Sequence, residues 1–507
     1  MRLLRALLAA SILWACATRA ADLRIGVAAD VTSMDPHFLN LQPNINIGWQ
    51  VFDALTHVDE NARLIPGLAV SWRALDATTW EFKLRRGVRF HDGSELTAQD
   101  VVFSIERTLQ VQNGQLRPFT QRIVAKETPD LYTVRLKTAA PYAMVPYDLN
   151  SVFIVSRKAA AGARPEDFDS GKAMVGTGPF RFVRFARGDR VELARNDKYW
   201  GGVPPWERVT FRIVPSDPAR LAALLSGDLD LIEQVPTADL DRIRRDALLQ
   251  TAQKISWRTI FFHLDQREQA QGGGARNPFR DLRVRRALSM AINRQAIAER
   301  LMDGAAVPAS NLVSPPVYGY APDLKPDVYD LEGAKRLLAE AGYPDGFATT
   351  LSAPNNRYVN DEQIAQAVAQ MLARVGVRAR VQAMPMNVYL PKGARGELAF
   401  AMLGWGSFSA DLALRSLVAT PDPKKGFGAF NWSGYSNRKV DELLERAFAT
   451  VDDKAREELA REAMRIAMRE QAVIPLHHQV ATWAMKRSLS YAPRTDEFTF
   501  AHHVRPR

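Results

Sequence analysis

The sequence predicts an α/β protein built from at least two lobes. The chain has 507 residues, of which 47% are hydrophobic, which is enough apolar surface for more than one core. Segments with helical spacing are followed, after short connections, by short apolar segments typical of strands, and this alternation favours an α/β fold. Residues 53–175 are richer in strand signals and therefore predict a separate α+β subdomain.

Strand signals come first along the chain. Residues 80–84 alternate apolar and charged side chains, as expected of a strand with one buried face. The turn at residues 85–87 and the renewed alternation at 88–90 predict a hairpin. The same alternation at residues 132–136 and 209–213 predicts two further strands.

Helix signals follow the strands. Thr97 and Asp100 have the spacing of a capping box, which predicts a helix beginning just after Thr97. Pro218 is expected to begin a second helix, which Gly227 ends, and a short strand at residues 228–232 follows it. An apolar stripe from residue 284 to residue 292 predicts a third helix that ends near Gly304.

The last third of the chain continues the alternation. Asp330 is expected to cap a helix that stops at Gly342. Apolar residues from 364 to 375 predict another helix, which Gly376 ends before a strand at residues 377–381. Ser436 is expected to cap a final helix that carries Val440, Leu443 and Leu444.

The first twenty residues have the pattern of a signal peptide. Arg2 and Arg5 supply the positive start, residues 3–14 supply a short apolar core, and residues 18–20 supply small residues at the cleavage positions. The apolar run is shorter than the ~20 residues that a stable membrane span needs. We therefore expect an exported protein that begins at Ala21 after cleavage.

The only cysteine, Cys16, lies inside this segment. Cleavage after Ala20 would leave a chain without disulfides or thiol chemistry. The alternative is a lipoprotein box at residues 13–16, in which Cys16 carries the lipid. The bulky Trp14 argues against this alternative.

The formal charge of +11 does not indicate a nucleic-acid-binding protein. The basic residues are dispersed among 56 acidic ones, and the chain has no long basic run and no aromatic–basic motif of the RNA-binding type. A solvated basic surface explains the charge, so we expect no nucleic-acid partner.

Signatures of common enzymes are missing from the sequence. It contains no phosphate-binding Gly-x-x-x-x-Gly-Lys loop, no His-Glu-x-x-His and no Gly-x-Ser-x-Gly. The adjacent pairs His477–His478 and His502–His503 are poorly placed to chelate one ion, because neighbouring side chains point apart. We therefore predict no enzyme activity, no metal site and no cofactor; the alternative is an exported hydrolase with an unfamiliar site.

A series of short motifs resembles the family-5 extracellular solute-binding proteins, the dipeptide, oligopeptide and nickel receptors of ABC importers. The motifs follow the family's order across the whole mature chain: Ser33–Pro36, Pro66–Trp72, Phe82–Gly93, Leu96–Val102, Gly176–Phe180, Asn196–Trp200, Val284–Leu288, Ala341–Pro344, Tyr435–Asn437 and Ile474–Leu476.

The resemblance implies a two-lobed periplasmic binding protein-like fold of class II with an extra α+β subdomain. The first lobe would combine residues 21–52, 176–260 and 476–507, the extra subdomain would be residues 53–175, and the second lobe would be residues 261–475. A periplasmic monomer would then capture a small polar solute between its lobes and deliver it to the permease subunits of an ABC importer.

The resemblance also implies the class of ligand. A short peptide is the expected solute, and the alternatives are a nickel chelate, haem, an opine or a sugar. The ligand loop contains no histidine, so a nickel chelate has no obvious ligand there.

The ligand loop of the second lobe would be residues 404–411. By resemblance, Gly404 and Trp405 would form a wall of the cleft, and Asp411 would pair with the ammonium group of a ligand. The family's Asp-Pro pair is missing here, and Leu412 follows Asp411 instead. The alternative is therefore that Asp411 caps a helix beginning at Leu412.

Two further patches complete the expected site. Arg357, beside Tyr358 and just before a helix, could hold a ligand carboxylate through two parallel hydrogen bonds. Ser33 and Met34 follow the first strand and, by resemblance, would face the same cleft, although a core role suits Met34 equally well.

Overall fold

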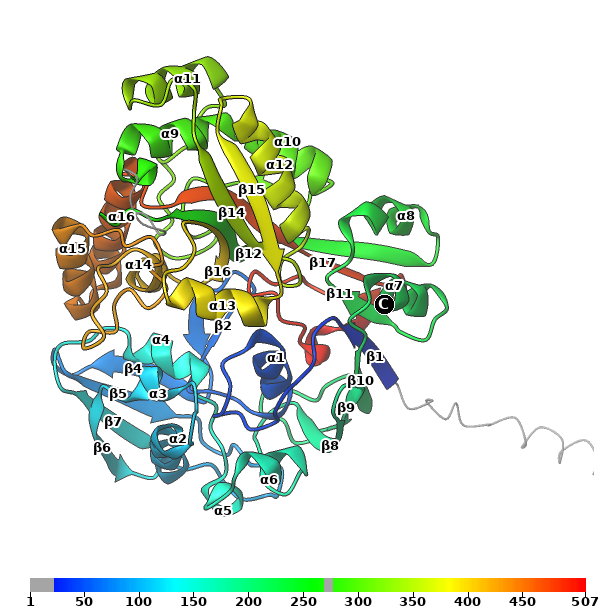
Figure 1. Cartoon of the computed structure of the whole chain (residues 1–507). Helices are drawn as coiled ribbons and strands as arrows, with labels where there is room; N and C mark the ends of the chain where they lie inside the picture. The colour runs from blue at the N-terminus through cyan, green and yellow to red at the C-terminus, as the bar shows by residue number, and fades with distance from the viewer. Residues whose placement is uncertain (1–21, 269–276) are drawn as a thin grey trace, which may run out of the picture.

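The computed structural model describes residues 22–268 and 277–507. The expected signal peptide and Cys16 lie outside the described residues. Figure 1 shows one part of the molecule around β14, β15 and the helices α9, α11 and α12, and another part around β1, β10 and the sheet of β4–β7.

A mixed sheet of eleven strands runs through both parts. Its order is β15-β14-β16-β12-β17-β11-β1-β10-β9-β8, and β13 pairs with β17. β1 is parallel to β10 and β11, and β14 is parallel to β15 and β16, which confirms the α/β class. The strands are β1 (Asp22–Val27), β8 (Phe180–Ala186), β9 (Arg190–Arg195), β10 (Arg208–Ile213), β11 (Leu231–Glu233), β12 (Leu249–Leu264), β13 (Ala306–Pro308), β14 (Ala348–Pro354), β15 (Arg378–Met384), β16 (Phe400–Gly406) and β17 (Ile474–Lys486).

The two longest strands, β12 and β17, carry the chain between the two parts. They pair antiparallel from Leu249–Lys486 to Phe262–Ile474, with register shifts between residues 255 and 261. β17 pairs with β11 at one end, whereas β12 pairs with β16 at the other end. Each half of the molecule is therefore attached to the same ladder.

Residues 53–175 contain a second sheet of four antiparallel strands. Its order is β4-β5-β7-β6, and a separate hairpin of β2 and β3 precedes it. These strands are β2 (Thr56–Val58), β3 (Leu64–Pro66), β4 (Ala69–Ala74), β5 (Thr79–Leu84), β6 (Ile123–Asp130) and β7 (Thr133–Thr138). Short β18 (Leu489–Ser490) and β19 (Arg505–Pro506) pair near the C-terminus.

The predicted hairpin at residues 80–90 is wrong. β5 pairs with β4 and β7, whereas residues 88–90 make only the isolated bridge between Arg89 and Glu95. Val88 and Phe90 alternate because both side chains are buried in the core below the sheet, and not because they belong to a ladder. The strands predicted at 80–84, 132–136 and 209–213 are confirmed as β5, β7 and β10.

Local capping signals placed several helices correctly. Asp100 accepts a hydrogen bond from the Thr97 backbone at 3.0 Å and completes the capping box of α2 (Ala98–Gln110). Asp330 caps α11 (Leu331–Glu340). The caps of α7 (Asp217–Leu225) and α15 (Arg438–Ala449) are Ser216 and Asn437, so Pro218 and Ser436 each lie one or two positions from the role expected of them.

The helix predicted after residue 284 is interrupted at residues 292–293, and then resumes to the end of a π-helix at Ile297–Leu301, close to the expected end near Gly304. α9 (Leu282–Ala291) ends because the Asn293 side chain accepts a hydrogen bond from Ala296 and starts a new short helix, α10 (Arg294–Ala296). The other helices are α1 (Gln42–Val51), α3 (Arg117–Thr120), α4 (Val145–Asp148), α5 (Arg157–Ala160), α6 (Pro165–Asp169), α8 (Leu240–Arg245), α12 (Asp361–Ala373), α13 (Met386–Ala394), α14 (Ala410–Leu417) and α16 (Asp453–Arg469).

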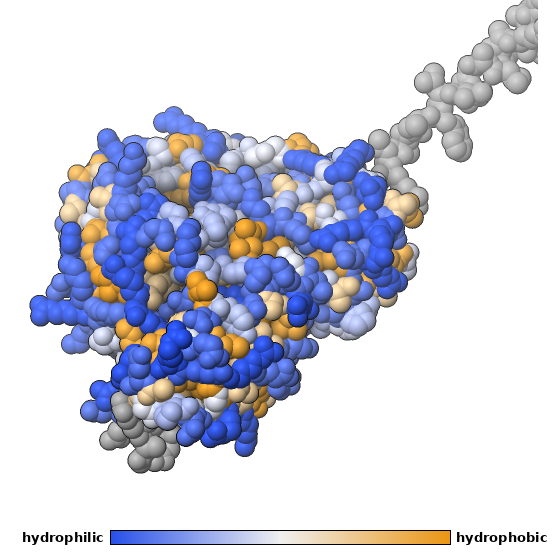
Figure 2. Space-filling model, turned by 90° about the horizontal axis from the view of Figure 1, so that it is seen from above, coloured by the Kyte–Doolittle hydropathy of each residue, from blue (hydrophilic) through white to orange (hydrophobic). Residues whose placement is uncertain are grey.

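The surface of the described chain is mostly hydrophilic. Figure 2 shows one face of the molecule on which hydrophobic residues form small separate patches among polar ones. None of the helices in residues 22–268 and 277–507 is both long and apolar enough to cross a membrane.

Buried charges in this fold are paired across distant segments. Arg107 on α2 donates two hydrogen bonds of 2.7 Å to Asp35, which explains the aspartate of the Ser33–Pro36 motif. Arg258 on β12 lies 2.8 Å from Glu497. Such pairing is needed because an isolated buried charge is strongly unfavourable.

His263 should make the protein sensitive to acid. It is buried on β12, neither ring nitrogen has a hydrogen-bond partner among residues 22–268 and 277–507, and burial lowers its pKa to about 3. The unfolded chain binds the proton first as the pH falls, so stability is lost from about pH 6.5 downwards. We expect His263→Phe, which keeps a ring beside Phe261 and Trp432, to reduce the loss of unfolding free energy between pH 7 and pH 4.5 by about 2–3 kcal/mol.

Chemical denaturation at the two pH values measures this effect, and each protein at pH 7 serves as its own reference. An equal loss of stability in both proteins would contradict the assignment of His263 as an acid-sensitive group.

Candidate functional site

A cavity of about 900 Å³ lies between residues of the extra subdomain and residues from the second half of the chain, between 315 and 461. Cavities of this size are typical of small-molecule sites. Its lining comes from the β2–β3 hairpin, β4, β5 and α4 on one side, and from residues 315–322, the β16–α14 loop and the start of α16 on the other. The lining includes the aromatic residues Trp72, Trp80, Tyr147, Tyr318, Tyr320 and Phe408.

Aromatic rings meet across this cavity. Tyr147 of α4 stacks on Phe408 of the β16–α14 loop, with ring centroids 5.8 Å apart and an interplanar angle of 14°. The ring centroid of Tyr318 lies 6.3 Å from that of Tyr147. The extra subdomain and the loop that follows β16 are therefore in direct contact at the cavity through the rings of Tyr147 and Phe408.

Arg456 of α16 packs against the rings of both Tyr147 and Tyr318. Its guanidinium lies 4.5 Å from the Tyr147 ring and 4.8 Å from the Tyr318 ring, and its side chain is 1% exposed. Burial opposes its charge, but the Asp411 carboxylate and the two tyrosines outweigh burial and raise the pKa of Arg456. Burial raises the pKa of Tyr147 to about 12, so this phenol stays protonated at neutral pH.

Asp411 has a different place from the two that the sequence suggested. It is fully buried, and its Oδ2 lies 3.6 Å from Nε of Arg456. α14 begins at Ala410 after Ser409, so Asp411 lies inside the first turn, where its Oδ1 accepts a hydrogen bond from the Leu412 backbone at 2.9 Å. Its charge is balanced inside the protein, behind the cavity wall.

Gly404 and Trp405 lie at the end of β16. Tyr358 donates a hydrogen bond of 3.1 Å to the Gly404 carbonyl, and a Cβ on Gly404 would lie 2.7 Å from the Tyr358 ring. Glycine is therefore required where these two segments meet. Trp405 is half-buried, with its ring 4.8 Å from that of Phe430.

Arg357 is an exposed cation with an unusual environment. Partial burial and the nearby charge of Arg258 lower the pKa of Arg357. No carboxylate of the described residues forms an ion pair with Arg357, so it can accept an anionic group.

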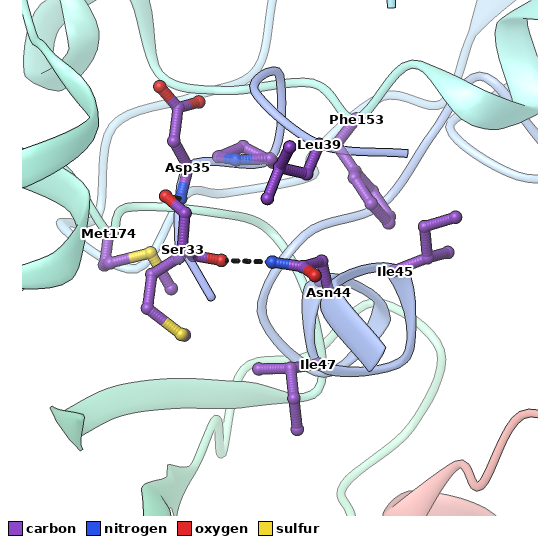
Figure 3. Close-up of a pocket in the computed structure, with 11 residues that line it drawn as sticks. Ser33, Asp35, Leu39, Asn44, Ile45, Ile47, Phe153 and Met174 are labelled. Atoms are coloured by element: carbon purple, nitrogen blue, oxygen red, sulfur yellow. Dashed lines mark hydrogen bonds between the residues drawn. The ribbon is translucent and has the colours of Figure 1, made fainter. Parts of the chain in front are cut away.

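Ser33 and Met34 are buried and hold their own loop together. The Met34 backbone donates a hydrogen bond of 2.7 Å to Asp169, and Asn44 donates one of 2.7 Å to the Ser33 carbonyl (Figure 3). Both residues line a cavity of about 10 Å³, which holds about one water molecule and no larger solute.

None of the seven residues that the sequence singled out lines the 900 Å³ cavity. Phe408, three residues after Trp405, does line it. The sequence offers a weak signal for the residues that were missed, because Tyr147 follows Pro146 and Tyr318 follows the pair Pro315–Pro316. Aromatic residues beside prolines in short connections are suited to a rigid wall.

Within residues 22–268 and 277–507, no group of three or more histidine, cysteine, aspartate or glutamate residues is arranged to hold a metal ion. The residues that line the cavity are largely aromatic, proline and charged side chains.

Comparison with known proteins identifies relatives along most of the chain. Residues 63–416 match the bacterial extracellular solute-binding proteins, family 5 Middle. The glutathione-binding protein GsiB of Salmonella choleraesuis is 30% identical over 488 residues, covering 92% of this chain and 91% of that protein. Heme-binding protein A of Haemophilus influenzae is 29% identical over 466 residues, covering 85% of this chain and 82% of that protein.

Solved structures share the fold. The substrate-binding protein CtaP of Listeria monocytogenes superposes with a TM-score of 0.84 at 22% identity, over 96% of this chain and 99% of that chain. The periplasmic binding protein DppA of Helicobacter pylori, in complex with the peptide STSA, superposes with a TM-score of 0.80 at 24% identity, over 96% and 99% of the two chains.

Asp411→Asn should destabilise the protein, because Arg456 would lose its buried carboxylate partner. Breaking a buried ion pair from one side typically costs about 3 kcal/mol or more. The matched control is Asp453→Asn, because Asp453 also lies 3.0 Å from Arg456 but its side chain is 70% exposed. We expect the control to change the free energy of unfolding by less than about 0.5 kcal/mol. If denaturant titrations gave the same change in the free energy of unfolding for both variants, the buried ion pair of Asp411 with Arg456 would not stabilise the fold as inferred.

Proposed function

The chain belongs to the bacterial extracellular solute-binding proteins of family 5, and on that basis we propose that it captures a short peptide in the 900 Å³ cavity. It is the substrate-binding component of an ABC-type importer and not an enzyme. Its partners are a small-molecule or peptide ligand and the permease subunits of the importer.

The composition of the cavity supports a peptide ligand. The lining combines aromatic and proline side chains with the cations Arg63, Arg73 and Arg461 and the acids Asp453 and Glu457. A short peptide presents a carboxylate, an ammonium group and apolar side chains together, which matches this mixture. GsiB is named for glutathione, a tripeptide, and DppA was solved with a peptide.

The proposed lobes follow the sequence expectation. Residues 21–52, 176–260 and 476–507 form the first lobe, residues 53–175 form its extra subdomain, and residues 261–475 form the second lobe. The borders at 260 and 475 fall within β12 and β17, so hinge bending would be concentrated in those strands. Closure would be favoured by a ligand that contacts both sides of the cavity.

The protein is proposed to act as a monomer after export. Family members are extracellular or periplasmic binding proteins. The pattern of residues 1–20 supports cleavage after Ala20 and release into the periplasm without a lipid on Cys16.

Thermal unfolding with candidate ligands tests the peptide proposal. A ligand at one hundred times its Kd stabilises the folded protein by about 2.7 kcal/mol. We expect glutathione or a set of di- to tetrapeptides to raise the Tm, and to be recovered unchanged after incubation. The matched arms are haem, an opine, a sugar and a nickel chelate. Stabilisation by one of these arms and by no peptide would contradict the peptide assignment.

Phe408→Ala and Tyr147→Ala test the place of binding. Each removes one ring of the stacked pair, so we expect a ~10-fold or greater loss of peptide affinity in calorimetric titration. Val388→Ala is the control, because Val388 is exposed and lies outside the cavity lining. Unchanged affinity in both ring variants would place the peptide elsewhere.

N-terminal sequencing of the secreted protein tests the export proposal. We expect the mature chain to begin at Ala21, because the signal peptide ends at Ala20. A chain that begins with an acylated Cys16 would instead identify a lipoprotein.

A further inference from the structure

A second cavity, of about 380 Å³, lies in the part of the chain assigned to the second lobe. Its lining comes from α9, the first residue of α10, residues 309–310, the loop 324–327, the end of α16 with Gln471 just after it, and the start of β17. It shares no lining residue with the 900 Å³ cavity. It is therefore a separate recess, beside the strand that crosses between the two halves.

The recess contains a buried cation. Arg294 is 5% exposed and donates hydrogen bonds to the Pro475 carbonyl at 2.8 Å, the Ser289 carbonyl at 3.0 Å and the Ser289 hydroxyl at 2.7 Å. A guanidinium has five N–H groups, so two remain uncommitted. Burial lowers the pKa of Arg294 to about 10, and the more distant Asp327 only partly offsets this effect.

Arg294, like the buried Arg285, which donates its hydrogen bonds to backbone carbonyls, differs in this respect from Arg107 and Arg258. Arg107 and Arg258 lie within 2.8 Å of a carboxylate. Within the described residues, no carboxylate lies at ion-pair distance from Arg294. Asp327 is linked to Arg294 through the Ser289 hydroxyl, which accepts a hydrogen bond from Arg294 at 2.7 Å and donates one of 2.5 Å to Asp327. The two uncommitted N–H groups of Arg294 are therefore available to an anion that enters the recess.

Beside Arg294 lies an unused acceptor. Gln471 is 7% exposed; its Nε2 donates a hydrogen bond of 2.8 Å to Asp327, but its buried Oε1 has no partner among the described residues. Its backbone φ of 49° lies in the left-handed region, where glycine usually ends a helix such as α16. A non-glycine residue in this region carries a conformational cost.

The rim of the recess is positively charged. Arg286, Lys325 and Arg469 are exposed and surround the opening, and Asp327 is the one acid in the lining. Arg469 is partly engaged, because it lies 3.4 Å from Glu462. The recess as a whole attracts anions.

We propose that this recess is a second binding site, for a small organic anion that also carries a hydroxyl or amino donor. The acid group binds Arg294 and the rim cations, and the donor hydrogen-bonds to Oε1 of Gln471. Carboxylates and phosphate esters share this chemistry. The site is independent of the peptide cavity.

A matched pair of probes tests the proposal. Malate and succinate are both dicarboxylates and differ in one hydroxyl group. In calorimetric titration at low ionic strength we expect malate to bind ~10-fold more tightly than succinate, because only malate satisfies Gln471. Glycerol 3-phosphate and sulfate form a second pair of probes, of which only glycerol 3-phosphate carries a hydroxyl donor. If this pair binds more tightly than malate and succinate, the site prefers a phosphate group; if it binds more weakly, the site prefers a carboxylate.

Three variants assign the binding to the recess. Gln471→Met keeps the size of the side chain without the acceptor, so malate and succinate should bind equally. Arg294→Gln should weaken both ~10-fold or more. Should Arg294→Gln fail to fold, Arg286→Gln combined with Lys325→Gln on the exposed rim should weaken both probes instead.

The peptide cavity provides the control. Phe408→Ala should leave malate binding unchanged, and the recess variants should leave the binding of a stabilising peptide unchanged. Equal binding of malate and succinate by the unaltered protein, binding that is insensitive to the recess variants, or no binding of any probe would overturn the second site.

Discussion

The antiparallel ladder of β12 and β17 is the constraint on which the rest of the structure depends. It attaches β16 on one side and β11 on the other, so both halves of the molecule are positioned by the same hydrogen bonds. Its register shifts lie between residues 255 and 261, and such irregularities bend a strand and are common beside functional sites. There Trp257 donates its backbone N–H to Thr495 and leaves no room for a Cβ on Gly406, at the end of β16. The loop that supplies Phe408 to the cavity therefore begins at a point fixed by the ladder.

Much of the fold could be predicted because its signals are local. The capping box of Thr97 and Asp100, the cap at Asp330 and the positive φ of Gly376 each depend on a few neighbouring residues. Strand pairing is different, because β1 pairs with β10 and β11 about 200 residues away. Alternation at residues 88–90 was mistaken for a strand because a buried loop and a strand can both bury every second residue. The order of the strands within the sheets was therefore not predicted, and the family resemblance supplied only the division of the chain into lobes.

Tertiary packing, which the sequence does not reveal, determines where the expected site residues lie, and Asp411 illustrates this. In the sequence, an aspartate after Gly404–Trp405 can meet a ligand, cap a helix or join an ion pair, and its neighbours do not decide among these roles. The decision comes from Arg456, which is 45 positions later and reaches Asp411 only because α16 packs against α14. The same holds for Tyr147 and Phe408, whose stacking joins segments that are more than 250 residues apart. The expected ligand loop contains Phe408, and tertiary packing decides which side chains of that loop line the proposed cavity.

The distribution of charge limits how a solute can bind. The acids at the cavity are engaged, since Glu457 lies 2.7 Å from Arg461 and Asp453 lies 3.0 Å from Arg456. A ligand ammonium group would have to share these carboxylates with arginines already in place. Arg63, in the lining, and Arg357, on the exposed segment after β14, form no ion pair with any carboxylate of the described residues. A ligand carboxylate can meet either of them without displacing an internal partner. The cost of desolvating a charge is offset only by a free counter-charge. We therefore expect the protein to bind the carboxylate of a solute more strongly than its ammonium group.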